Sequence, residues 1–214
     1  MILKLNVKLH YRLPAPMDLL LQIEAADLAD QWVRSAEIWT SDVAHFSRVA
    51  ADDGIGERIW IRAEGDFSCT YIAEIAVNRP ALDISTLSQT PLYLLPGETI
   101  KHLMPSRYCP SDQFQAFVDA EFGYLAGGAR IVAMRDWIES AFSYVPGSSH
   151  AQTTALDSFV QRQGVCRDFA HVLVALARAS SIPARFVSVY APDVTPQDFH
   201  AVAEVYIGGE LAPH

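Results

Sequence analysis

The fold is decided by QGVCRDFAHVLVALARASSIP, at residues 163–183. Apolar side chains fall on most sides of a helix drawn through residues 165–179, which is typical of a helix buried in the centre of a domain. Gly164 lies just before this helix, and the breaker that ends in Pro183 stops it. We therefore predict that residues 165–179 form the central helix of a domain.

Two segments that read as strands follow this helix, at 184–190 and 200–207. Because the loop at 191–199 contains Pro and Asp, we predict that it joins them as an antiparallel pair. Three earlier segments have helical spacing: Ser111 to Phe122, a second that opens at Gly127-Gly128, and a third that starts at a Thr154/Asp157 capping box and is closed by Gly164. The carboxyl-terminal half is thus predicted to be α+β.

The beginning of the chain has the period-two alternation of half-buried strands. Residues 3–13 alternate throughout, and residues 57–63 and 67–77 read as a hairpin that turns at Glu64-Gly65-Asp66. The composition of residues 19–29 leaves a short helix open there. We predict a mostly antiparallel β structure for this region.

Prolines mark the boundary between the two halves. Between residues 78 and 110 they interrupt every possible regular element, at Pro80, Pro91, Pro96, Pro105 and Pro110. We therefore predict a β-rich domain at 1–80, an extended connector at 81–110 and an α+β core at 111–214.

Composition and charge restrict the classes of function. Of the 214 residues, 50% are hydrophobic and 19% are charged, which predicts a folded chain. The formal charge of -9 disfavours nucleic acid and anionic membrane surfaces as partners. The sequence has no apolar run of about 18 residues and no signal-peptide pattern. We therefore expect a cytoplasmic location.

Cysteine usage points to chemistry at one position. Cys69, Cys109 and Cys166 are odd in number and widely spaced, which argues against a disulfide framework. Cys166 falls at the amino end of the predicted buried helix, where free N–H groups and the helix dipole favour a thiolate. His200 begins the second later strand, and such a histidine can complete a Cys–His pair. The alternative is that Cys166 is a small buried hydrophobe and that it never meets His200.

Several stretches carry a family resemblance. RQGVCRDFAH at 162–171, IPAR at 182–185 and HAVAEVY at 200–206 closely resemble the bacterial transglutaminase-like cysteine protease family. PSRYCPSD at 105–112 and the segment around Phe142-Ser143-Tyr144 are similar to connecting segments of those proteins. The resemblance extends over nearly the whole chain, strongly after residue 105.

The resemblance implies a papain-like core, with Cys166 as the nucleophile and His200 as general base and later general acid. It implies cleavage or transfer at a peptide or protein amide bond through a thioester. An oxyanion hole would use the Cys166 N–H, and the family pattern suggests Tyr144 as a second donor. No cofactor is implied, and no clustered carboxylate pattern for calcium is present. A metal site is not expected at Cys166 and His171, because they lie about 140° apart around a helix.

The chain departs from the family where that family has its third catalytic residue, an aspartate about fifteen positions after the histidine. Residues 208–214, GGELAPH, contain no aspartate. We expect either that the chain is truncated or that another acid substitutes, with Asp193 and Asp198 as weak candidates. A binding or scaffolding protein on the same fold therefore stays open as an alternative.

Two further expectations concern the surroundings of this site. Missing terminal strands would leave an uncovered edge at 202–207, through which copies of the chain could associate. Asp168 is expected to satisfy N–H groups at the helix start or to pair with an arginine such as Arg185.

Overall fold

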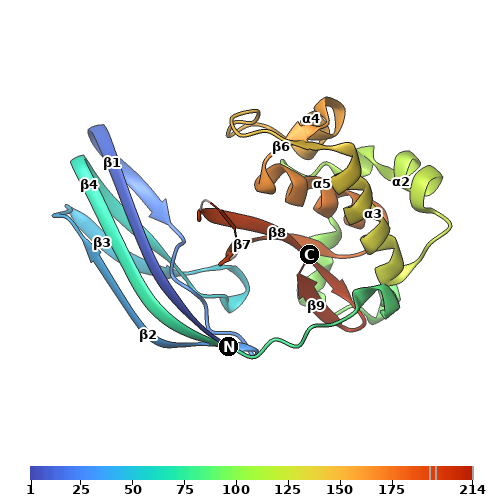
Figure 1. Ribbon diagram of the computed structural model, residues 1–214, viewed down its shortest axis with the longest axis horizontal. Coiled ribbons are helices and arrows are strands. Elements are labelled where there is room, and N and C mark those ends of the chain that lie inside the picture. Colours follow the sequence, from blue (N-terminus) through green and yellow to red (C-terminus); the bar gives the residue numbers. More distant parts are fainter. Residues whose placement is uncertain (193, 196, 214) are drawn as a thin grey trace. The chain divides into compact units, whose positions relative to one another are not determined.

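The protein is described by a computed structural model that covers residues 1–192, 194–195 and 197–213 (Figure 1). The chain divides into two compact units, Met1–Ala81 and Leu82–His214. In chain order the elements are β1 (Ile2–Leu21), β2 (Gln31–Thr40), β3 (His45–Ala50), η1 (Asp52–Gly54), β4 (Glu57–Val77), η2 (Ile84–Thr86), η3 (Leu92–Leu94), α1 (Gly97–Ile100), η4 (Lys101–Leu103), η5 (Ser111–Gln113), α2 (Gln115–Phe122), α3 (Gly127–Ala141), β5 (Ser143–Tyr144), α4 (Ala155–Gln161), β6 (Gln163–Gly164), α5 (Cys166–Ala179), β7 (Ala184–Tyr190), β8 (Phe199–Ile207) and β9 (Glu210–Pro213).

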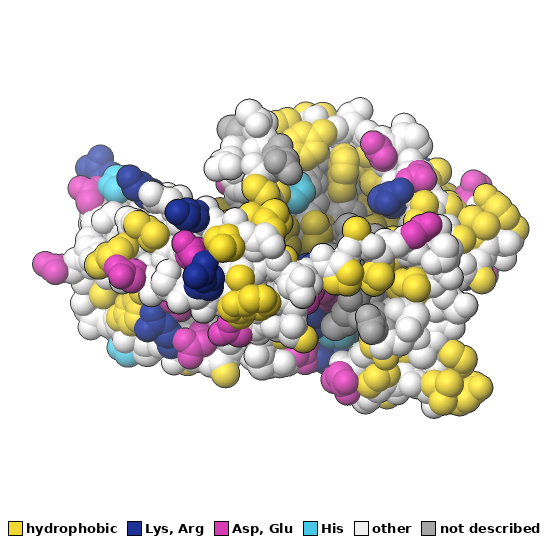
Figure 2. All heavy atoms as spheres, turned by 60° about the horizontal axis from the view of Figure 1, so that its bottom comes forward, with side chains coloured by type: hydrophobic (Ala, Val, Ile, Leu, Met, Phe, Trp, Pro, Cys, Tyr) yellow, Lys and Arg dark blue, Asp and Glu magenta, His cyan; other side chains and the backbone are white. Residues whose placement is uncertain are grey.

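Unit 1 is an antiparallel sheet built around one long strand. Strand β4 pairs with β1, β2 and β3, and its alternate residues from Ile59 to Ile75 belong to one buried cluster. The opposite face carries exposed aromatic rings, because Trp32, Trp39 and Trp60 are each 41–50% exposed. Hydrophobic and charged side chains are interspersed on the surface of this unit (Figure 2).

The predicted hairpin at Glu64-Gly65-Asp66 is wrong, because β4 continues through these residues. Gly65 has a φ of 68° and pairs with Leu13 of β1, and the register shifts between Leu13 and Met17. A glycine at positive φ beside a register shift bends a strand without reversing it. Residues 19–21 belong to β1, so they extend the first strand well beyond its predicted end.

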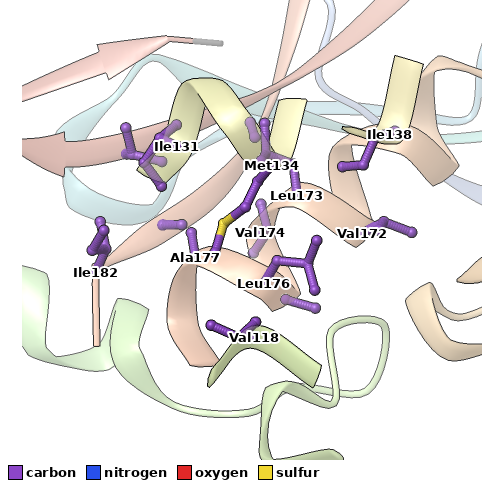
Figure 3. Packing of buried hydrophobic residues seen from close by; sticks show 14 of the residues in the cluster. Val118, Ile131, Met134, Ile138, Val172, Leu173, Val174, Leu176, Ala177 and Ile182 are labelled. Carbon is purple, nitrogen blue, oxygen red and sulfur yellow. The ribbon is translucent and has the colours of Figure 1, made fainter. Parts of the chain in front are cut away.

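Unit 2 is built around α5, as the sequence predicted. Val172 to Ala177 of α5 are at most 5% exposed and pack with Val118 of α2, with α3 residues such as Met134, and with Ile182 (Figure 3). Strands β7 and β8 form the predicted antiparallel pair, and Ala203 and Val205 of β8 belong to the same core. The fold class is therefore α+β, with an antiparallel sheet against a central helix.

The stretch predicted as an extended connector contains short helical turns between its prolines, namely η2, η3, α1 and η4. It also packs closely on α3. The Gly128 N–H donates to the Leu87 carbonyl at 2.8 Å, and a Cβ on Gly128 would lie 1.6 Å from the Ile84 oxygen. Glycine at 128 is therefore required by this close approach.

The predicted uncovered edge of β8 is wrong over most of its length. Strand β9 pairs antiparallel with β8 from Ile207 back to Glu204. Gly208 and Gly209, both at positive φ, reverse the chain between the two strands. A Gly-Gly pair is a recognised hairpin signal, and the sequence analysis did not use it.

Candidate active site

Cys166 is the first residue of α5 and is half-buried. The residue before the helix is Val165, which has no side-chain oxygen to accept a hydrogen bond from the helix start. Its carbonyl accepts from the N–H groups of Asp168 and Phe169, at 2.9 and 3.1 Å. Within the described part of the chain, the Cys166 N–H has no hydrogen-bond acceptor. The site therefore holds a free backbone donor beside a thiol at the positive end of a helix.

Asp168 organises the residues before Cys166. Its side chain is 1% exposed, and Oδ2 accepts from the Val165 N–H at 2.8 Å while Oδ1 accepts from the Arg167 guanidinium at 2.9 Å. Burial by itself would raise the pKa of Asp168, but hydrogen bonds from Ser149, Val165 and Arg167 outweigh burial and hold that pKa below its usual range. The expected role at the helix start is thus confirmed.

Asp168 does pair with an arginine, but with Arg167 rather than with Arg185. Arg185 lies on β7 and forms an ion pair with Glu204 of β8 at 2.6 Å. Residues 185 and 204 are opposite each other in the strand register, which brings the two charges together.

Tyr144 lies beside the segment that leads into Cys166. Strands β5 and β6 are parallel, with Tyr144 opposite Gly164, and the Val145 N–H donates to the Gly164 carbonyl at 2.9 Å. The Tyr144 side chain is 59% exposed and its ring lies 6.0 Å from the ring of Phe169. The fold thus brings the neighbourhoods of Tyr144 and Cys166 together.

The third helix ends earlier than predicted. Arg162, with a φ of 55°, ends α4, and Gly164 belongs to β6. The Arg162 guanidinium lies over the rings of Trp137 and Phe159, at 4.5 and 4.3 Å, while its carbonyl accepts from the Ser143 N–H at 2.9 Å. Arg162 therefore ties the end of α4 to β5, from which Tyr144 projects.

His200 lies at the end of the β7–β8 pair that is farther from the carboxyl end of α5. A tight turn follows α5, and the Arg178 guanidinium donates to the Ala184 carbonyl at 2.8 Å, so β7 starts beside the carboxyl end of α5. At about 1.5 Å per helical and about 3.3 Å per strand residue, α5 and β7 are each about 20 Å long. His200 pairs with Val189 near the far end of β7. No hydrogen bond joins the His200 ring to the Cys166 thiol among the residues described.

His171 is a buried group that the sequence analysis did not single out as important. Its ring stacks on Tyr108 at 5.3 Å and packs against Phe186 at 4.9 Å. It is 7% exposed, and Nδ1 has no hydrogen-bond partner among the residues that the structure describes. Burial, helped by the charge of Arg167, lowers its pKa to about 4. The motif spacing predicted proximity to Asp168 but contained no signal for this stack.

The candidates for a third catalytic residue receive no support from geometry. Asp193 lies outside the residues that the structure describes. Asp198 accepts a hydrogen bond from the adjacent Phe199 N–H at 2.7 Å, which is a local turn interaction. Across the described ranges, no group of three or more His, Cys, Asp or Glu residues is placed to hold a metal ion, and no helix is long and apolar enough to cross a bilayer.

Comparison with known proteins identifies relatives of this arrangement. A family profile of the transglutaminase-like superfamily matches residues 119–211. The crystal structure of a candidate cysteine protease from Cytophaga hutchinsonii is 30% identical, with a TM-score of 0.89, and the match covers 100% of this chain and 78% of that one.

More distant matches agree with the fold. The periplasmic domain of TgpA from Pseudomonas aeruginosa is 16% identical, with a TM-score of 0.50, over 97% of this chain and 71% of that chain. An uncharacterized protein of Mycobacterium leprae is 40% identical over 60 residues, which is 28% of this chain. That segment spans 22% of the Mycobacterium leprae protein.

Proposed function

This chain belongs to the transglutaminase-like superfamily, and from that premise we propose that it is a thiol enzyme that cleaves or transfers at amide bonds through Cys166 and His200. The observation that carries the proposal is the start of α5. There a half-buried thiol and an unpartnered backbone N–H share the positive end of a buried helix. A thiolate and an oxyanion are the anions that such a position stabilises.

The reaction proceeds in two halves. The Cys166 thiolate attacks the carbonyl carbon of an amide, so that a C–S bond forms and the carbonyl oxygen becomes an oxyanion. When the tetrahedral intermediate collapses, the C–N bond breaks and the leaving amine takes a proton from the His200 imidazolium. Water then attacks the thioester as neutral His200 removes its proton, and the C–S bond breaks to regenerate the thiolate. If an amine attacks in place of water, the result is transfer.

Two donors are assigned to the oxyanion. The first is the Cys166 N–H, and the second is Tyr144, which β5 holds beside Gly164. Each hydrogen bond to an oxyanion typically contributes about 10²–10³-fold to the rate. The proposed substrate is a peptide or protein amide, and we propose a cytoplasmic location for the reaction. The TgpA domain of related fold is periplasmic, so fractionation of cells tests this location directly.

A second function is favoured by a specific observation. Among the described residues the Cys166 thiol and the His200 ring share no hydrogen bond. A protein that keeps the fold and binds a partner without chemistry would have this property.

The experiment that separates the two functions is alkylation of Cys166 by iodoacetamide from pH 4 to 9, resolved by mass spectrometry and repeated on His200→Ala. A thiolate paired with an imidazolium reacts well below the ordinary thiol pKa of about 8.5. Burial raises the pKa of both Cys69 and Cys109, so they are internal controls that react slowly.

A reactive limb below pH 7 that His200→Ala abolishes is the result expected for an enzyme. An ordinary thiol curve in both proteins contradicts the enzyme and leaves the binding function. If the low-pH limb persists in His200→Ala, the thiolate depends on the helix start alone and His200 is not its partner.

A further inference from the structure

The carboxylate of Asp168 is the junction of three segments around Cys166. It accepts from Val165, which precedes Cys166, and it pairs with Arg167, which follows it. The same Arg167 nitrogen donates to the carbonyl of His150, at 2.9 Å. His150 lies in the loop that follows β5. One buried carboxylate thereby connects the helix start to the loop that continues from Tyr144.

The loop is fixed at two points. At its beginning, the Val145 N–H donates to the Gly164 carbonyl at 2.9 Å. Further along, two contacts connect it to α5: the Ser149 side chain hydrogen-bonds to the Asp168 carboxylate, and the Arg167 guanidinium donates to the His150 carbonyl. Inside the loop, the Thr153 N–H donates to the His150 carbonyl, which therefore accepts two hydrogen bonds.

We propose that Asp168 is a positioning residue for the reaction at Cys166: directly through Ser149 and indirectly through Arg167 it latches the 145–153 loop to the start of α5 and so holds Tyr144 and Cys166 in one fixed relation. This inference rests on the proposed function for its catalytic consequence. Asp168 and Arg167 do not need to touch the substrate.

The geometry requires an aspartate at this position. Oδ2 faces the Val165 N–H and Oδ1 faces the Arg167 guanidinium, and the Ser149 side chain is a third hydrogen-bond partner of the carboxylate. An asparagine has one acceptor oxygen, so its NH₂ group would face one of these donors and leave it unsatisfied. Gly164 packs closely on this side chain, because a Cβ on Gly164 would lie 2.6 Å from the Asp168 Cβ.

A charge effect and a positioning effect predict opposite changes in the rate of Cys166 alkylation for one variant. Asp168→Asn removes a negative charge two residues from Cys166, which by electrostatics alone would favour the thiolate and speed alkylation at low pH. If Asp168 acts by positioning, the same change slows alkylation because the thiol and its partners lose alignment. Arg167→Met slows alkylation under both mechanisms, so Asp168→Asn distinguishes them.

The experiment measures iodoacetamide alkylation of Cys166 at pH 6 and amide hydrogen exchange at Val145 in the full chain. The variants are Asp168→Asn and Arg167→Met, and we expect the second to disturb folding less than the first, because the Arg167 side chain is 29% exposed and that of Asp168 1%. The matched control is Asp157→Asn, which makes the same charge change at the same position of α4. Thermal unfolding of all variants measures their general destabilisation.

We expect both latch variants to slow alkylation by about tenfold and to speed exchange at Val145, while Asp157→Asn changes only the unfolding temperature. Faster alkylation in Asp168→Asn, or latch variants that behave like Asp157→Asn, would overturn the proposal. If the wild-type chain has no low-pH reactivity, the proposed function fails separately. In that case, amide hydrogen exchange at Val145 tests the positioning role of Asp168. Faster exchange in the two variants supports this role, and unchanged exchange refutes it.

Discussion

Helices α4 and α5 begin with the same hydrogen bond and finish their first turns differently. In each, an aspartate at the third helical position accepts from the N–H before the helix, Asp157 from Thr154 and Asp168 from Val165, both at 2.8 Å. In α4 the Thr154 hydroxyl accepts from the Asp157 N–H in return, and the N–H of the first residue, Ala155, donates to the Tyr108 carbonyl.

In α5 the Asp168 N–H donates to the Val165 carbonyl at 2.9 Å rather than to a capping side chain, and the first N–H of the helix is open within the described part of the chain. Valine replaces the capping threonine, and the first residue is Cys166, whose N–H has no acceptor in the described part of the chain. A complete cap stabilises a helix start by about 1 kcal/mol, so α5 forgoes stability at the position where an anion could bind. The difference shows that two helices with the same first hydrogen bond can leave different donors open, and that the open donor of α5 belongs to Cys166.

The largest expected effect is a pH dependence of stability caused by His171, a buried histidine of α5 that has no counterpart in α4. Its pKa is lowered from 6.5 to about 4 by burial first and by Arg167 second, Asp168 opposing and Arg178 adding to the decrease. The unfolded chain therefore binds the proton between pH 6.5 and 4 while the folded chain does not. The free energy of unfolding should fall by about 3 kcal/mol as the pH drops through this window.

His171→Phe keeps a ring between Tyr108 and Phe186 and cannot be protonated. We expect urea unfolding of this variant to lose most of the decrease in stability between pH 6.5 and 4 while its stability at pH 7.5 stays close to that of the wild type. An equal acid slope in the two proteins would show that His171 does not titrate as its burial implies.

The second effect is expected from crowding at the open helix start. A Cβ on Gly164 would lie 2.6 Å from the Asp168 Cβ, so Gly164→Ala should destabilise the protein by about 2 kcal/mol. Gly97→Ala is the control, because nothing lies within 4 Å of its added Cβ. Thermal unfolding compares the two variants, and equal unfolding temperatures would mean that the start of α5 adjusts without strain.

The third prediction concerns removal of the side-chain cap at the start of α4. Thr154→Ala removes the hydroxyl that accepts from the Asp157 N–H, and α4 should lose about 1 kcal/mol of stability. Thr154→Ser should restore most of it. Because the change leaves α5 intact, we expect an unchanged rate of Cys166 alkylation. A large loss of alkylation would mean that the two helix starts are coupled.

The smallest effect comes from making the open start resemble the closed one. Val165→Thr places a hydroxyl where α4 has one, and it should stabilise α5 by about 0.5 kcal/mol. The hydroxyl oxygen also adds partial negative charge near Cys166, so alkylation at pH 6 should slow by about twofold. Denaturant unfolding and mass spectrometry measure the two changes. A stabilised variant with faster alkylation would contradict this account.

Much of unit 2 could be predicted because its elements are locally encoded. The apolar residues of α5 predict a buried helix, and the Thr154/Asp157 capping box marks the start of α4 within one residue. Strands β7 and β8 are separated by a loop and alternate in burial along β8. Each of these signals lies within one turn or one strand, so it can be recognised without knowledge of the rest of the fold.

The remainder depends on contacts between distant segments. Gly65 is a residue type that is common in turns, and only its pairing with Leu13 of β1 shows that β4 bends there without reversing. The contact of Arg167 with the His150 carbonyl joins residues 17 positions apart, and a backbone oxygen has no sequence signature. For the same reason, the spacing of Cys166 and His200 could predict a pair but not the separation of their reacting atoms.

Strand β4, around which unit 1 is built, also determines when this unit can fold during synthesis. Every other strand of the unit pairs with β4, and the register joins Ile2 to Ala76. Strands β1, β2 and β3 therefore leave the ribosome before their partner exists. Until Val77 has emerged, their apolar faces have no native strand to pair with, and non-local pairing of this kind is slow. The native sheet of unit 1 can therefore be completed only when the last residues of β4 have left the exit tunnel.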